Sequence, residues 1–243
     1  MSKPIGVFDS GVGGLTVVRE LVRQLPYEDI IYFGDTARVP YGIKSKETVI
    51  RFSIDDALFL LNQGVKLICV ACNTVSSVAL PIIKSHFKIP IIGVIVPGAK
   101  EAVYATRNKR VGVIGTRGTI KSHAYENEIR KLSPRIKVTA AACPLFVPFV
   151  EEGWLNGKVV LDVAKTYLKP MKDARIDTLI LGCTHYPLLK DIIRKVLGNK
   201  VILIDSARQV AMEVKKTLDA EGMLNKSHRA KYRFYVSDNP EWF

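Results

Sequence analysis

The stretch KLICVACNT, residues 66–74, and its counterpart DTLILGCTH, residues 177–185, decide the fold of this chain. Each is a short apolar run that stops at a small residue and then turns polar, a pattern typical of a buried parallel strand that enters a loop. In an open α/β sheet, ligands bind in the loops beyond the carboxyl ends of the strands. The pattern therefore predicts Cys72 and Cys183 at two strand tips, beside hydroxyl and amide donors.

A second correspondence indicates an internal repeat. The chain opens IGVFDSG from residue 5 and later reads VGVIGTRG from residue 111, and both runs lead into a turn with glycine and a hydroxyl group. The openings are 106 residues apart, from 5 to 111, and the cysteines are 111 apart, from 72 to 183. These similar offsets favour two α/β lobes of the same plan, each with one hydroxyl turn and one cysteine turn.

Strand and helix patterns alternate along the chain, which predicts parallel sheets with helices on both faces. We expect an α/β fold of two pseudo-symmetric lobes, each a mainly parallel sheet flanked by helices, with the active site between them. The first lobe is expected to comprise residues 1–96 and 207–243, and the second residues 97–206, because a C-terminal helix must find a face to cover. The expected strands are 5–8, 29–33, 66–71, 91–94, 110–114, 137–140, 178–181 and 201–204, and the expected helices are 15–24, 45–62, 74–84, 97–106, 118–131, 157–171, 187–197 and 207–221.

The charge balance is basic, with 36 Lys and Arg residues against 23 Asp and Glu, a formal net charge of +13. Such a balance can mark nucleic-acid binding. The basic residues are nevertheless spread along the chain, without zinc-finger spacing or interleaved aromatic residues. A basic surface that attracts a small anionic substrate is therefore favoured. No run approaches the roughly 18 apolar residues of a membrane span and no secretory leader opens the chain, so we expect a cytoplasmic protein.

The four cysteines are too few for a disulfide scaffold. Cys69 and Cys72 form a Cys-x-x-Cys pair, but a redox pair opens a helix and Cys69 lies inside an expected strand. A zinc site would need a second closely spaced pair, and Cys143 and Cys183 stand alone. We therefore expect no metal, and we interpret Cys69 and Cys143 as packing residues.

The segment DSGVGGL, residues 9–15, contains neither a dinucleotide fingerprint nor a Walker loop. It predicts a tight glycine turn that opens a helix, whose free backbone N–H groups suit a carboxylate or another anion. No lysine stands in a recognisable Schiff-base motif, which would have indicated pyridoxal phosphate.

Four ordered motifs give the chain a specific resemblance to a known family. They are VFDSGVGGL at 7–15, FGDTARVPYG at 33–42, ACNT at 71–74 and LGCTHYPL at 181–188. Together they resemble bacterial glutamate racemase over most of the chain, to about Asp205. The resemblance implies a cofactor-independent isomerase of two lobes that supplies D-glutamate for peptidoglycan, and hence for cell-wall biogenesis and cell shape. It also implies a cytoplasmic homodimer whose small-molecule partner is glutamate.

The resemblance implies the site residues as well. Cys72 and Cys183 would be the catalytic thiols, and Asp9, His185 and Glu151 would assist proton movement. Glu152 is the alternative to Glu151, because both lie in the segment FVEEG, residues 149–153. The implied substrate contacts are Asp9, Ser10, Tyr41, Gly42, Asn73, Thr74, Thr116, Thr184 and His185.

Paired cysteines suit racemisation, which removes the Cα proton from one face of an amino acid and delivers another to the opposite face. Two groups on opposite walls can do this without crossing the substrate, one as thiolate base and the other as thiol acid. Without a cofactor, the developing dianion needs preorganised N–H and hydroxyl donors. His185 could pair with Cys183 or with the substrate, and Asp9 could assist Cys72 or receive the substrate ammonium.

Two alternatives remain open. An aspartate or related amino-acid racemase would share the paired cysteines, although the DSGVGG motif and the Tyr41-Gly42 loop favour glutamate. A basic nucleic-acid-associated regulator on a racemase scaffold is motivated by the net charge of +13 alone.

Overall fold

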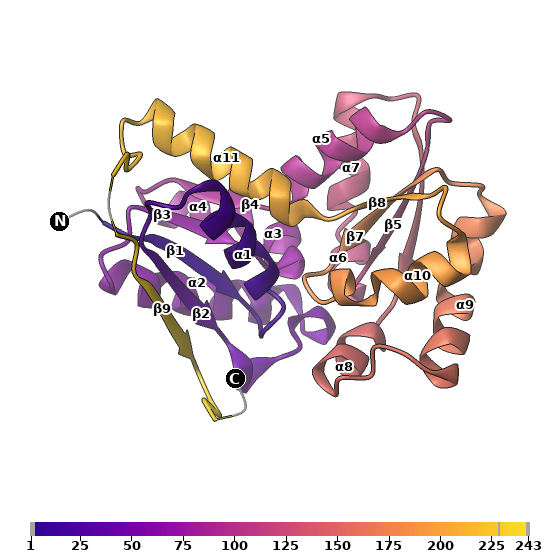
Figure 1. The fold of residues 1–243 in the computed structure, drawn as a ribbon, viewed down its shortest axis with the longest axis horizontal. Coiled ribbons are helices and arrows are strands. Elements are labelled where there is room, and N and C mark those ends of the chain that lie inside the picture. The colour runs from indigo at the N-terminus through magenta and orange to yellow at the C-terminus, as the bar shows by residue number, and fades with distance from the viewer. Residues whose placement is uncertain (1–2, 228, 242–243) are drawn as a thin grey trace.

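Two separate parallel sheets form the molecule, and the computed structural model describes residues 3–227 and 229–241 of it (Figure 1). The first sheet has the strand order β4-β3-β1-β2-β9 and the second the order β6-β5-β7-β8, and all neighbouring strands run parallel. This confirms the expected fold class. The strands are β1 Ile5–Asp9, β2 Ile30–Gly34, β3 Leu67–Val70, β4 Ile91–Gly93, β5 Arg110–Gly115, β6 Lys137–Ala142, β7 Thr178–Gly182, β8 Ile202–Ile204 and β9 Tyr232–Val236.

The strand order of the two sheets confirms that both lobes follow one plan. The first sheet contains the run β4-β3-β1-β2, and the second contains the run β8-β7-β5-β6. β3 pairs with the central strand β1, and β7 pairs with its counterpart β5. Cys72 and Cys183 follow β3 and β7, so the two cysteines leave equivalent strands.

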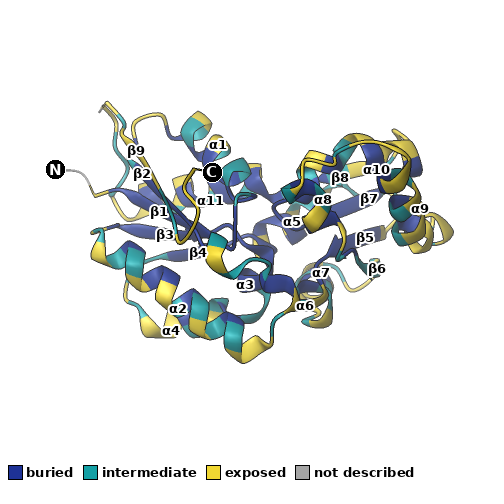
Figure 2. Cartoon of the chain, turned by 90° about the horizontal axis from the view of Figure 1, so that it is seen from below, coloured by how far each residue is buried: buried dark blue, intermediate teal, exposed yellow. Residues whose placement is uncertain are grey.

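Helices cover both faces of each sheet, as buried strands require. In the first lobe, α1 and α11 cover one face with side chains such as Leu21 and Val214, and α2 and α4 cover the other. In the second lobe, α5 and α7 cover one face, and α9 and α10 cover the other. Figure 2 shows this layering, with buried strands inside and exposed residues on the outer sides of the helices. The helices are α1 Leu15–Gln24, α2 Lys46–Asn62, α3 Asn73–Val78, α4 Leu80–His86, α5 Ile95–Ala105, α6 Arg117–Lys121, α7 Ala124–Leu132, α8 Phe146–Glu151, α9 Lys158–Asp173, α10 Lys190–Leu197 and α11 Ser206–Ala220, with 3-10 turns η1 Thr36–Arg38, η2 Tyr41–Ile43 and η3 Tyr186–Leu189.

Three expected helices are each divided in two, so those single-helix predictions were wrong. The segment 187–197 begins as the 3-10 turn η3 and continues as α10. The segment 74–84 divides into α3 and α4 at Ala79, because Pro81 has no N–H to donate and is tolerated only in the first turn of the new helix. The segment 118–131 divides into α6 and α7 at His123, whose φ of 54° is left-handed. Helix α8 and strand β9 were not expected at all.

The C-terminal segment packs on the first sheet. Helix α11 lies along α1 and over the first sheet in Figure 1, and it also contacts α5. Beyond it, β9 adds to the edge of the first sheet by pairing with β2. The buried ion pair of Lys66 Nζ with Glu28 Oε2, 2.6 Å apart, and hydrogen bonds from Asn225 to Glu28 fix the connecting turn. The residue bounds proposed for the two lobes stay a prediction.

None of the helices in the described part of the chain combines the length and the apolar character needed to cross a bilayer.

Candidate active site

The two equivalent cysteines meet at one cavity between the lobes. Cys72 stands at the N-terminus of α3 and Cys183 follows β7, and their exposed fractions are only 4% and 6%. Both line a cavity of about 10 Å³. That volume is about the minimum for a single water molecule. The carboxyl ends of the two sheets therefore face each other with almost no space between them.

Most of the residues singled out from the sequence line this cavity, including both cysteines. Pro40, which belongs to the motif at 33–42, lines it as well, and so does Val147, to which no sequence signal pointed, because an apolar wall residue resembles any core residue. Asp9 and Glu151 do not line the cavity, and they contact residues that do. The lining consists of Ser10, Pro40, Tyr41, Gly42, Cys72, Asn73, Thr74, Thr116, Val147, Cys183, Thr184 and His185.

Cys72 lies in a buried setting close to the carboxylate of Asp9. Its thiol donates to Ser10 Oγ at 3.7 Å. Burial, with the nearby charge of Asp9, raises the pKa of Cys72 to about 12. Asp9 is itself buried at the end of β1, where its Oδ2 accepts hydrogen bonds from the backbone N–H groups of Gly14 at 3.0 Å and Gly11 at 3.3 Å. Burial raises the pKa of Asp9, and the charge of His185 and these N–H groups act against that rise.

Cys183 lies in a more polar setting. Its Sγ is 3.7 Å from His185 Nδ1, and His185 Nε2 hydrogen-bonds to Glu151 Oε1 at the end of α8. Burial opposes charge on His185, but its hydrogen bonds to Cys183 and Glu151 outweigh burial and raise the pKa to about 10. Glu152 is exposed. Of the two adjacent acids, the structure thus brings Glu151 to the histidine beside Cys183.

Side chains from the two lobes bond directly across the junction. Thr184 Oγ1 of the second lobe donates to Asp9 of the first, at 3.3 Å. Thr74 Oγ1 of the first lobe lies 2.9 Å from Thr116 Oγ1 of the second. Thr116 also caps helix α6 by accepting from the N–H of Thr119 at 3.2 Å. These hydroxyl contacts hold the lobes closed around the cysteines.

Tyr41 supports the loop that approaches the cavity. Its hydroxyl hydrogen-bonds to Asp35 Oδ2 and, at 2.9 Å, to Asp56 Oδ2, and Arg38 pairs with both of those carboxylates. Burial raises the pKa of Asp56 and of Tyr41. The Tyr41 hydroxyl is therefore held by this acidic cluster. The next residue, Gly42, lies close to the second lobe.

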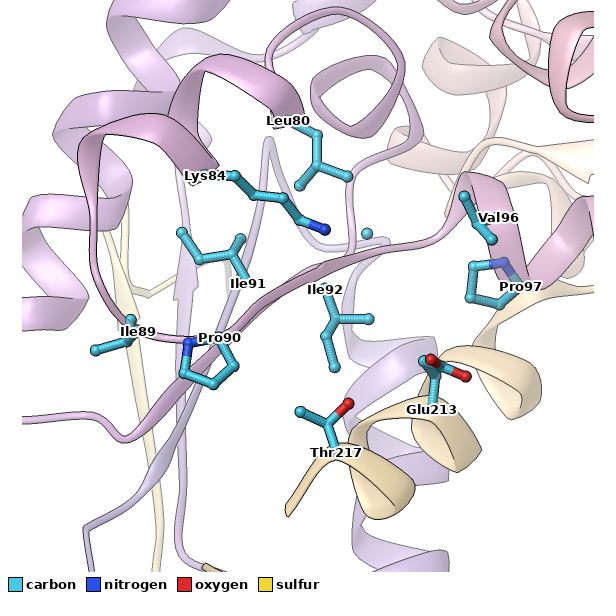
Figure 3. A pocket seen from close by; sticks show the side chains of 11 residues that line it. Leu80, Lys84, Ile89, Pro90, Ile91, Ile92, Val96, Pro97, Glu213 and Thr217 are labelled. Carbon is cyan, nitrogen blue, oxygen red and sulfur yellow. The ribbon is translucent and has the colours of Figure 1, made fainter. Parts of the chain in front are cut away.

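A wider cavity elsewhere lacks comparable chemistry. It has a volume of about 470 Å³ and lies where α4, β4 and α11 meet, with Lys84, Ile92 and Glu213 in its wall (Figure 3). Neither Cys72 nor Cys183 lines it. Within residues 3–227 and 229–241, no cluster of three or more His, Cys, Asp or Glu side chains is arranged to hold a metal ion.

Comparison with known proteins decides the family. The family model described as Asp/Glu/Hydantoin racemase matches residues 5–214. This chain belongs to that family. A relative from Geobacter metallireducens, a glutamate racemase, is 51% identical over 99% of this chain and 90% of its own length.

Two solved structures of the racemase family share the whole fold. The glutamate racemase of Francisella tularensis, solved with D-glutamate, has a TM-score of 0.94 and 46% identity over 100% of this chain and 90% of its own. The glutamate racemase of Thermus thermophilus, solved with β-chloro-D-alanine, has a TM-score of 0.88 and 50% identity over 99% of this chain and 90% of its own.

Proposed function

We propose that this protein interconverts L- and D-glutamate, with Cys72 and Cys183 as the two bases and without a cofactor. The observation that carries the proposal is the meeting of two cysteines from equivalent strands at one interlobe cavity. The substrate assignment is supported by glutamate racemases whose sequences are about half identical to this one over nearly the whole chain. The D-glutamate formed would serve peptidoglycan synthesis.

The unlike surroundings of the two cysteines support a defined resting state. Cys72, whose pKa is raised to about 12, is the thiol that donates a proton. Cys183 is the base that first takes the substrate proton in this proposal, because His185 lies beside its sulfur and is held there by Glu151. Each turnover exchanges these two states, since a proton leaves the substrate to one sulfur and arrives from the other. The reverse reaction then begins from the exchanged state.

The donors around the cavity support stabilisation of the intermediate. Deprotonation at Cα adds negative charge to a carboxylate, so hydroxyl and amide donors fixed in advance lower the barrier. Ser10, Thr116 and Thr184 supply hydroxyl groups at the cavity, and Asn73 supplies an amide. These four residues are at most 8% exposed, so each of these hydrogen bonds acts in a low-dielectric setting.

Opening of the lobes is part of the cycle that we propose. A cavity of about 10 Å³ cannot admit glutamate. The contacts that close the cavity are a few hydrogen bonds between hydroxyl-bearing side chains and places where a glycine lies close to the other lobe. Such contacts can separate at a modest cost in free energy. Substrate entry and product release therefore follow lobe opening, a kind of motion that sets kcat in many enzymes.

We also propose that the protein acts as a cytoplasmic homodimer, as the resemblance implies. Its mass in solution, measured by light scattering after size-exclusion chromatography, checks the dimer. A particle of 27.0 kDa would be a monomer and would contradict it.

The decisive experiment separates the two bases. Cys72→Ser and Cys183→Ser should each nearly abolish racemisation, because each face of the substrate needs a proton-transfer group. A glutamate with chloride on its β-carbon loses HCl after a single deprotonation, so each variant should eliminate chloride from one enantiomer only, with opposite preferences.

The matched control is Cys143→Ser, which alters a buried cysteine that does not line the cavity. It should racemise normally if it folds, as judged by circular dichroism. Near-normal racemisation by either active-site variant would refute the two-base assignment. Faster turnover of L-aspartate than of L-glutamate by the unaltered protein would instead move the substrate to aspartate.

A further inference from the structure

Asn73 presents an unused donor beside the catalytic thiol. It follows Cys72 directly, lines the interlobe cavity and has an exposed fraction of only 4%. Its Oδ1 accepts a hydrogen bond from the hydroxyl of Tyr125 at 2.7 Å. Its Nδ2 forms no hydrogen bond with any residue of the described part of the chain. Since the amide is planar, fixing Oδ1 on one side leaves the two N–H bonds on the other.

The ring of Tyr125 packs against two glycines of its own lobe. It lies on α7 of the second lobe and is 2% exposed. A β-carbon built on Gly98 would lie 3.3 Å from Cε1 of this ring, and one built on Gly182 would lie 3.2 Å from Cε2. The two glycines therefore make room for the ring. The hydroxyl then reaches Asn73 Oδ1 of the first lobe and lies 3.3 Å from Ser206 Oγ at the start of α11.

We propose that Tyr125 is a positioning residue for racemisation: its hydroxyl fixes the side-chain amide of Asn73 so that Nδ2 donates to the substrate carboxylate. Without a donor at Oδ1, the amide can rotate by half a turn and present its oxygen to an anion. That orientation would repel the dianion formed on deprotonation. Because Tyr125 and Asn73 belong to different lobes, the donor is oriented only while the lobes are together.

The inference rests on the proposed racemase function, and the experiment keeps the two apart. Initial rates are followed by circular dichroism for L- and D-glutamate in the unaltered protein and in Tyr125→Phe, which keeps the ring and removes only the hydroxyl. An inactive unaltered protein would overturn the function itself. With an active one, we expect Tyr125→Phe to lower kcat about tenfold, the effect of one hydrogen bond made mainly in the transition state, with a smaller change in KM.

A double-mutant cycle distinguishes positioning from a structural role. If Tyr125 acts through Asn73, adding Tyr125→Phe to Asn73→Ala should cost nothing further in kcat/KM. A hydroxyl that only stabilises the fold would lower kcat/KM by the same factor in both backgrounds, and this result would overturn the proposal. So would a Tyr125→Phe variant with unaltered kcat.

A second comparison tests the proposal if the Asn73→Ala variant is too slow to measure. Ser206→Ala removes the other partner of the Tyr125 hydroxyl and leaves the bond to Asn73. It should keep a nearly normal kcat, as should Tyr104→Phe, which makes the same chemical change at an 88% exposed tyrosine. Equal losses in Ser206→Ala and Tyr125→Phe would show that the hydroxyl network matters only as packing, and would overturn the assignment.

Discussion

Gly42→Ala tests whether close contact of the lobes is needed for catalysis. A β-carbon built on Gly42 would lie 2.6 Å from Cγ2 and 2.8 Å from Oγ1 of Thr116, and closer still to its Cβ. Carbon atoms pack at about 3.5–4.0 Å, so the lobes must separate by about 1 Å to admit the methyl group. Rotation of the Thr116 side chain cannot relieve this overlap, because its Cβ is fixed to the backbone.

Displacement on this scale should be costly to the reaction and nearly harmless to the fold. A misplacement of about 1 Å costs on the order of 100-fold in rate. We therefore expect Gly42→Ala to lower kcat/KM for both enantiomers by about that factor, as followed by circular dichroism. The melting temperature should change little, because each lobe keeps its own core.

The identity of the obstructing atom gives a sharper test. Thr116→Ala keeps the Cβ that the new methyl group meets, whereas Thr116→Gly removes it and costs only a few tenths of a kcal/mol as a helix cap. Gly42→Ala should therefore be partly rescued by Thr116→Gly and not by Thr116→Ala, each compared with its own single variant. An unimpaired Gly42→Ala enzyme, or equal rescue by both second changes, would refute the reasoning.

Three further predictions concern the groups beside the thiols. Asp9→Asn and His185→Asn should each lower kcat unequally in the two directions of racemisation. KM should change to compensate, because the equilibrium constant between the enantiomers is unity. Equal changes of kcat and KM in both directions would leave these residues only a substrate-positioning role. Glu151→Gln should lower the pKa of His185 and shift the alkaline limb of the pH profile of kcat/KM to lower pH. The same change at exposed Glu152 should not. Coincident pH profiles for the two variants would contradict the link between Glu151 and His185. The pKa of His185 is raised on folding from 6.5 to about 10, so its contribution to stability is complete below about 6.5 and is lost as the pH rises through about 10. The free energy of unfolding from urea titrations should decline over that range in the unaltered protein and less in His185→Asn, and parallel curves would show that His185 is not the group responsible.

Local patterns were sufficient for much of the fold. The buried strands of both sheets are short apolar runs, so the sequence pattern alone places Cys72 and Cys183 at strand tips. Prediction failed where the local signal was weak. Strand β9 is mostly exposed and lies at a sheet edge, and α8 is a six-residue helix that contains a proline, so neither shows a clear period.

The sequence by itself determined the two-lobed plan and the residue types needed for racemisation, because strand burial, glycine turns and the cysteine positions are written in short segments. Only the tertiary structure decided which acid serves His185, since Glu151 and Glu152 are neighbours in sequence and only one of them reaches the histidine. It also decided the contact of Tyr125 with Asn73, residues 52 positions apart on different lobes. Such pairs depend on how two separately packed lobes meet, and no local period records that orientation.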